Sequence, residues 1–129
     1  MRVALAVAVV AVGLKPPVIH EVFTPLGCPK HPTATLDYEG CAEAQILATD
    51  NKIDAKARAI FFKLAPGERS GFVRGEKEWL AYRRDNCAAE SSKYAGGTLA
   101  ALIDAQCQAA RNKTHLTDLS ELLRTLQSP

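Results

Sequence analysis

Two cysteines, Cys87 and Cys107, stand ten residues before and ten residues after Gly97. An α-helix rises about 1.5 Å per residue, so two helical arms that fold back at this glycine place each sulfur about 15 Å from the bend. Packed helices lie about 8–10 Å apart, which brings inward-facing Cα atoms at equal height within disulfide reach. The spacing therefore predicts an antiparallel helical hairpin clamped by a Cys87–Cys107 bond.

This bond leaves the two other cysteines, Cys28 and Cys41, to each other. Four cysteines allow three pairings, and the symmetry about the glycine favours this one. Two other uses of Cys28 stay open. Cys28-Pro29-Lys30-His31 has the spacing of a zinc ligand pair, although no second close pair accompanies it. Leu26-Gly27-Cys28 resembles the end of a bacterial lipobox, but lipidation would leave Cys41 unpaired. We expect no metal, no cofactor and no lipid anchor at Cys28.

The start of the chain has the composition of an export signal. Arg2 is followed by an unbroken apolar run from Val3 to Leu14, which is too short to span a bilayer but has the length of a signal-peptide core. We expect residues 1–13 to be a signal peptide, and a buried strand or helix is the alternative. The protein is then periplasmic or secreted, where disulfides are stable.

Breakers and apolar periodicity divide the rest of the chain. Residues 14–34 contain five of the seven prolines and predict an extended, irregular lead-in. Helices are expected over about 36–64, then from about 68–70 to 94, and from Thr98 as N-cap to about 126. Asn112 is expected to mark a kink or a boundary. No segment alternates long enough to predict a strand. The sequence predicts an all-α, disulfide-stapled bundle of about three helices over residues 35–127.

Composition and motifs exclude several classes of function. A net charge of +2 is too small for a typical nucleic-acid binder, so we expect no nucleic acid as partner. No glycine-rich phosphate loop and no HExxH motif occurs in the sequence. His20, His31 and His115 are isolated, without a nucleophile at a readable spacing. We therefore expect a protein that is not an enzyme.

Several short motifs follow one another in a fixed order: Cys41-Ala42, Trp79-Leu80-Ala81-Tyr82-Arg83, Cys87-Ala88-Ala89-Glu90, Tyr94-Ala95-Gly96-Gly97 and Cys107. Their order and spacing resemble the lysozyme inhibitor LprI-type domain, formerly a domain of unknown function, over about residues 28–126. The resemblance implies a bacterial, exported, helical and non-catalytic domain. The motif residues that it implies to be shared are Trp79, Leu80, Tyr82, Arg83, Tyr94, Gly96 and Gly97.

Most of these motif residues have a structural explanation. Trp79 is expected to anchor the packing of three helices. Arg83, one turn later, is expected to cover the tryptophan ring or to pair with an acid such as Glu76 or Glu90. The tyrosine and the two glycines between the last cysteines are expected to end one helix and pack the corner.

The chain also departs from the family pattern. Glu76 stands where the family usually has Gln, and His115 stands where it usually has Arg. Arg84 takes the place of an acidic residue, and the gap from Cys28 to Cys41 is about one residue longer than usual. These changes alter the charges on the helices but leave the apolar and cysteine skeleton intact.

Acidic residues gather in the first half of the first expected helix, and the candidate binding surface consists of Asp37, Glu39 and Glu43. Such a segment attracts a cationic protein such as lysozyme, or it simply places acids favourably near a helix N-terminus. We predict an exported binding protein whose leading function is lysozyme inhibition. The alternatives are an envelope structural or scaffolding protein that binds another envelope protein, and a carrier of a small ligand.

Overall fold

The computed structural model describes residues 13–129, so the expected signal peptide lies, except for Gly13, outside the described residues. Three long helices follow: α1 (Thr35–Lys63), α2 (Arg69–Ser91) and α3 (Thr98–Gln127). Two short 3-10 turns, η1 (Pro66–Glu68) and η2 (Ser92–Tyr94), connect them. The prediction of an all-α bundle of about three helices is confirmed.

Proline and glycine set the helix ends. α1 ends three residues before Pro66, which opens η1. Gly96 has a φ of 91°, in the left-handed region that glycine adopts without steric cost. Gly97 is extended and is the N-cap of α3, so the expectation that Thr98 is the cap is wrong by one residue.

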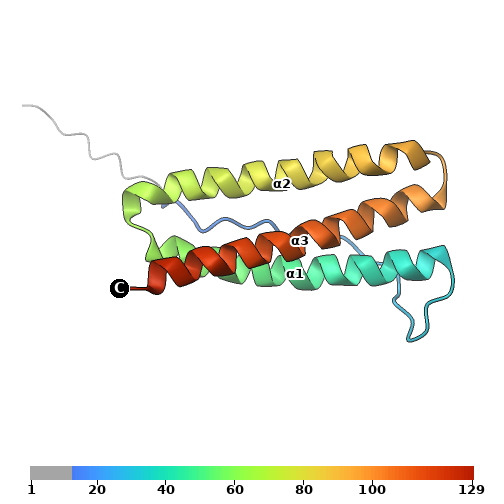
Figure 1. The fold of residues 1–129 in the computed structure, drawn as a ribbon, viewed down its shortest axis with the longest axis horizontal. Coiled ribbons are helices and arrows are strands. Elements are labelled where there is room, and N and C mark those ends of the chain that lie inside the picture. Colours follow the sequence, from blue (N-terminus) through green and yellow to red (C-terminus); the bar gives the residue numbers. More distant parts are fainter. Residues whose placement is uncertain (1–12) are drawn as a thin grey trace, which may run out of the picture.

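The central helix of the bundle is α3, which packs along both α1 and α2 (Figure 1). The helices α1 and α2 hardly contact each other. One side of the bundle, opposite α3, is therefore not closed by a helix.

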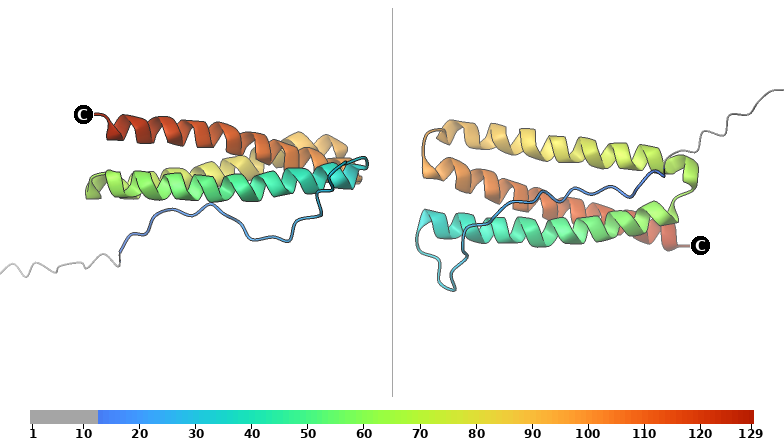
Figure 2. Two further views of the ribbon diagram at one scale, coloured as in Figure 1. Left: turned by 90° about the horizontal axis from the view of Figure 1, so that it is seen from below. Right: turned by 180° about the vertical axis from the view of Figure 1, so that it is seen from behind.

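The lead-in closes this side of the bundle. It runs in an extended path along the helices between α1 and α2, on the face opposite α3 (Figure 2). Ile19, only 2% exposed, packs into the same core cluster as Ile53, Ile60 and Leu119. The irregular lead-in predicted from the prolines is thus a packed part of the fold.

Polar contacts fix the lead-in at both flanks. The Ile19 N–H donates to Oδ1 of Asp54 on α1 at 2.8 Å, and Glu21 forms an exposed ion pair with Arg84 on α2 at 3.7 Å. Burial raises the pKa of Asp54, while the hydrogen bond from Ile19 opposes that rise. Farther along, a Cβ on Gly40 would lie 2.1 Å from the carbonyl oxygen of Gly27, so the chain passes against α1 where only glycine fits.

The structure contains both disulfides that the sequence favours. Cys87 joins Cys107 across the α2–α3 hairpin with a Cα–Cα distance of 5.5 Å. Cys28 joins Cys41 with a Cα–Cα distance of 4.5 Å and ties the lead-in to the first turns of α1. Because the sulfur of Cys28 is in this bond, it is not available as a zinc ligand or for a lipid thioether.

The helix boundary predicted at Asn112 is wrong. The sequence predicts a kink or a boundary there, yet α3 continues as one helix from Thr98 to Gln127. Asn112 is 0% exposed, and its side chain bonds to residues of α1 and α2. Its polarity serves a buried contact between helices and does not interrupt α3.

The two ends of the bundle differ. The α1–α2 connection and the end of α3 lie together at one end, which also holds the C-terminus (Figure 1). The start of α1 and the turn at Gly96 lie together at the opposite end.

The packing of the lead-in predicts a stability effect. Ile19→Ala removes a fully buried side chain from the core, so the free energy of unfolding should fall by about 2–4 kcal/mol. Val18→Ala is the matched control, because Val18 is 71% exposed and should change stability little. Urea unfolding measures both. Equal, small effects of the two variants would contradict the proposed role of the lead-in.

Candidate functional site

A buried polar network joins residues from all three long helices. Nη1 of Arg83 on α2 donates to Oδ1 of Asp50 on α1 at 2.7 Å and to Oδ1 of Asn112 on α3 at 2.7 Å. Nδ2 of Asn112 donates to the same Asp50 oxygen at 2.8 Å and to Oγ1 of Thr49 at 2.8 Å. Asp50 and Asn112 are 0% exposed, so these bonds satisfy groups that bulk water does not reach. The second carboxylate oxygen of Asp50, Oδ2, has no hydrogen-bond partner among the described residues and lies 4.0 Å from Nδ1 of His20.

The surroundings of Arg83 differ in part from the expectation. Its guanidinium carbon lies 5.5 Å from the centre of the Trp79 ring, which is one of the two expected contacts. Its acidic partner is Asp50, and the expected pairing with Glu76 or Glu90 is wrong. Those two acids have other partners, because Glu76 contacts His115 and Glu90 pairs with Arg111.

Trp79 also stacks against a histidine from α3. The rings of Trp79 and His115 stack with centroids 3.8 Å apart and planes inclined by 10°. Nε2 of His115 lies 2.9 Å from Oε2 of Glu76, and both residues are nearly buried. Glu76 and His115, two of the three positions at which the sequence is expected to depart from the family pattern, are therefore in contact with each other.

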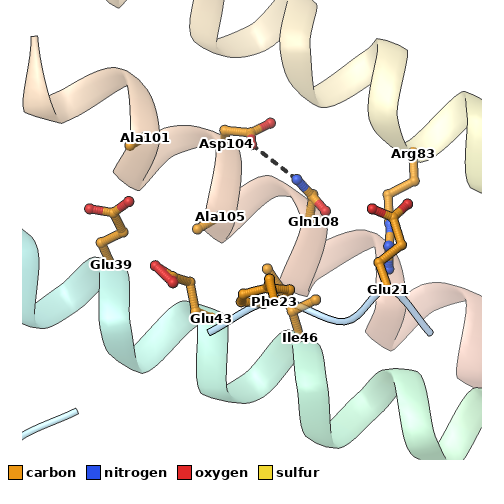
Figure 3. Close-up of a pocket in the computed structure, with 10 residues that line it drawn as sticks. All are labelled: Glu21, Phe23, Glu39, Glu43, Ile46, Arg83, Ala101, Asp104, Ala105 and Gln108. Atoms are coloured by element: carbon orange, nitrogen blue, oxygen red, sulfur yellow. Dashed lines mark hydrogen bonds between the residues drawn. The ribbon is translucent and has the colours of Figure 1, made fainter. Parts of the chain in front are cut away.

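A cleft of about 320 Å³ opens between α1, α3 and the lead-in (Figure 3). Its lining contains four carboxylates, those of Glu21, Glu39, Glu43 and Asp104. The remaining surface is mostly small or apolar and includes Phe23, Ile46, Ala101 and Ala105. Arg83 reaches the cleft from α2, so the buried network and the cleft share one residue.

The carboxylates of the cleft differ in how they are held. Glu43 accepts a hydrogen bond from the Leu26 N–H at 3.3 Å, and Asp104 accepts one from Nε2 of Gln108 at 3.0 Å. Burial, and then the charge of Glu43, raise the pKa of Glu39. The cleft is therefore an acidic surface in which like charges stand close together.

The three acids expected to form a binding surface do not all lie together. Glu39 and Glu43 line the cleft, whereas the carboxylate of Asp37 accepts hydrogen bonds from the N–H groups of Thr33 and Ala34, both at 3.1 Å. Those backbone hydrogen bonds lower the pKa of Asp37, which is the behaviour of an acid that caps a helix N-terminus. Sequence reasoning missed Glu21 and Asp104, because no local pattern relates them to α1.

The other motif residues occupy structural or exposed positions. Leu80 packs at the edge of the core cluster, and Tyr82 is 51% exposed on α2. Tyr94 ends η2, and the ammonium of Lys93 lies 5.5 Å from its ring centre. Gly96 and Gly97 make the turn into α3.

Two further observations concern the part of the chain from residue 13 to 129. No group of three or more histidines, cysteines and acids in it is arranged to hold a metal ion. None of its helices combines the length and apolar character that crossing a membrane requires.

Comparison with known proteins gives one match. The family model described as lysozyme inhibitor LprI matches residues 28–119, well over half of the chain. The chain belongs to the lysozyme inhibitor LprI family. No curated protein and no solved structure matches it significantly. The matched range contains both disulfides, the buried network and most of the cleft lining, but not Glu21 and Phe23.

The Glu76–His115 contact predicts energetic coupling in this LprI-family domain. Glu76→Gln and His115→Ala each remove one partner of a nearly buried contact, which should cost about 1–3 kcal/mol of unfolding free energy. The double variant loses this contact only once, so its loss should be at least about 0.5 kcal/mol smaller than the sum of the single losses. Glu78→Gln with His115→Ala is the control cycle, because Glu78 is exposed. Strict additivity in the first cycle, measured by urea unfolding, would contradict the coupling.

Proposed function

We propose that the protein is an exported, non-catalytic inhibitor of lysozyme. Membership of the LprI family is the observation that carries this proposal. The two disulfides support a location outside the cytoplasm, because such bonds persist in oxidising compartments. The expected signal peptide at residues 1–13 would provide the route of export.

The proposed mechanism is steric occlusion of the enzyme's substrate cleft, with attraction supplied by acidic side chains. Lysozyme is a cationic protein, and the four carboxylates around the cleft present the opposite charge at one place on the bundle. Complementary charge of this kind speeds association and orients the partners more than it adds affinity. The small total charge of the chain means that attraction must come from this local surface.

The first test measures protection of bacterial cell walls in a lysozyme turbidity assay. The native domain should inhibit at micromolar excess, and Glu39→Gln with Glu43→Gln should raise the half-inhibitory concentration about three- to tenfold, because each exposed pairing is worth up to about 1 kcal/mol. Glu78→Gln with Asp118→Asn is the matched control, since it removes two exposed charges away from the cleft.

Two outcomes of this assay would count against the proposal. Absence of protection by the native domain at micromolar excess would remove lysozyme as the partner. An equal loss in the control variant would show that net charge alone matters, and would move the contact surface away from the cleft.

The raised pKa of Glu39 predicts a dependence of binding on pH. An acid with a raised pKa takes up its proton at a higher pH than an ordinary glutamate, so the cleft loses negative charge early as the solution is acidified. The dissociation constant of the complex should therefore increase between pH 7 and pH 5, and the increase should be smaller in Glu39→Gln. Binding is measured directly by interferometry, because the activity of the enzyme itself changes with pH.

A further inference from the structure

The second half of α1 carries an outward-facing stripe whose cations have no acidic partner. Its members recur every three or four residues, so they share one face of the helix. They are Lys52, Ala55, Lys56, Ala59, Phe62 and Lys63. All are exposed except the second lysine, which is half-buried. None of the three lysines forms an ion pair with a described residue.

Two mostly apolar grooves flank this stripe and meet at Ala55. One groove, of about 410 Å³, lies between α1 and α3, and its lining includes Leu116 and Leu123. The other, of about 420 Å³, lies between α1 and the lead-in, and its lining includes Val18, which is 71% exposed. Apolar surface therefore extends from α3 across α1 to the lead-in, with the lysines of the stripe on it.

Phe62, the aromatic residue of the stripe, is 55% exposed and stands among cations. The guanidinium carbon of Arg58 lies 5.2 Å from the centre of its ring, and that of Arg69 lies 5.8 Å from it. Neither arginine forms an ion pair with a described residue. An exposed ring surrounded by unpaired cations fits a partner that is anionic at its surface and apolar beneath it.

The acids near this surface already have partners within the domain. Asp54, which lines the groove beside the lead-in, accepts the Ile19 N–H at 2.8 Å. On α3, Glu121 pairs with Arg124. An anionic partner would therefore meet unpaired bases here and little opposing charge, the reverse of the situation at the cleft.

We propose that the domain docks on an anionic lipid bilayer through this face of α1, with Phe62 and Val18 at the boundary between headgroups and acyl chains. Peripheral helices bind bilayers in this way, with apolar groups buried shallowly and lysines and arginines at anionic headgroups. The long basic side chains reach lipid phosphates while their methylene stems stay on the apolar surface. A soluble polyanion would use the bases alone and leave Phe62 and Val18 in water, so these two residues favour a bilayer.

Docking through the second half of α1 leaves the acidic cleft accessible, because the cleft is lined by the first half of that helix. The small net charge of the chain is thus the sum of two oppositely charged regions. The proposal requires only the domain and a bilayer, so it stands apart from lysozyme inhibition.

Co-sedimentation with lipid vesicles tests the role of the bases. The protein is purified after export, so that any signal peptide has been removed, and is mixed with vesicles of phosphatidylcholine alone or with an equal part of phosphatidylglycerol. It should bind the mixed vesicles about tenfold more tightly, or better, than the neutral ones. Lys52→Gln with Lys56→Gln should weaken that binding by about tenfold or more, because each base at an anionic surface contributes about fivefold in affinity. Lys77→Gln with Lys93→Gln, which removes two exposed bases outside this face, is the matched control and should change binding little.

A second pair of variants tests the apolar contact. Phe62→Ser should weaken binding to the mixed vesicles by about fivefold or more, because the ring no longer leaves water. Tyr82→Ser is the control, since Tyr82 is 51% exposed on α2 and should not contribute. Circular dichroism checks that each variant is folded.

Three outcomes would overturn the proposal. The protein could fail to bind either kind of vesicle, or the control variants could lose as much affinity as the variants of the stripe. A loss with the lysine pair but none with Phe62→Ser would show that the face binds polyanions by charge alone, and would also reject docking on a bilayer. None of these measurements contains lysozyme, so this proposal and the proposed function fail separately.

Discussion

A single buried guanidinium connects the three helices. Arg83 reaches from α2 to Asp50 on α1 and Asn112 on α3, and all three side chains are almost completely excluded from solvent. Removing water from such groups is costly, and an ion pair of this kind often adds little net stability. Its contacts instead specify register, because sliding any helix by one turn would leave a buried charge or amide unpaired. We regard this network as the contact that aligns the helices on which the cleft is built.

The second requirement of the fold is that something close the side where α1 and α2 do not meet. Residues of the lead-in do this with one buried isoleucine, Ile19, with two backbone N–H groups that donate to acids of α1, with an exposed ion pair to α2, and with the Cys28–Cys41 disulfide. Since the lead-in also contributes Glu21 and Phe23 to the cleft, the segment that completes the core also completes the candidate site. The Glu76–His115 pair lies in the same protected interior, beside Trp79.

The features that could be predicted from the sequence have local signals. Proline and glycine breakers mark the helix ends, and two sulfurs equally far from Gly97 indicate the hairpin and its bond. Ile19 has no such signal, because one isoleucine in a proline-rich segment has no periodicity that reveals burial. Asn112 was misinterpreted because a polar residue in an apolar stripe resembles an interruption unless its partners on other helices are known. The cleft could not be predicted from the sequence for the same reason. Its acids come from three separate segments, which only the tertiary structure brings together: Glu21, Glu39 with Glu43, and Asp104.

The arrangement of the ends of the bundle has a practical consequence. The C-terminus lies beside the α1–α2 connection, whereas the cleft is lined by the first half of α1 and the first third of α3, toward the turn at Gly96. A tag, dye or surface linker attached after the last residue therefore stands at the far end of a rod about as long as its helices. A domain coupled to a chip or bead in this way carries its acidic cleft in the half of the rod that is farther from the surface.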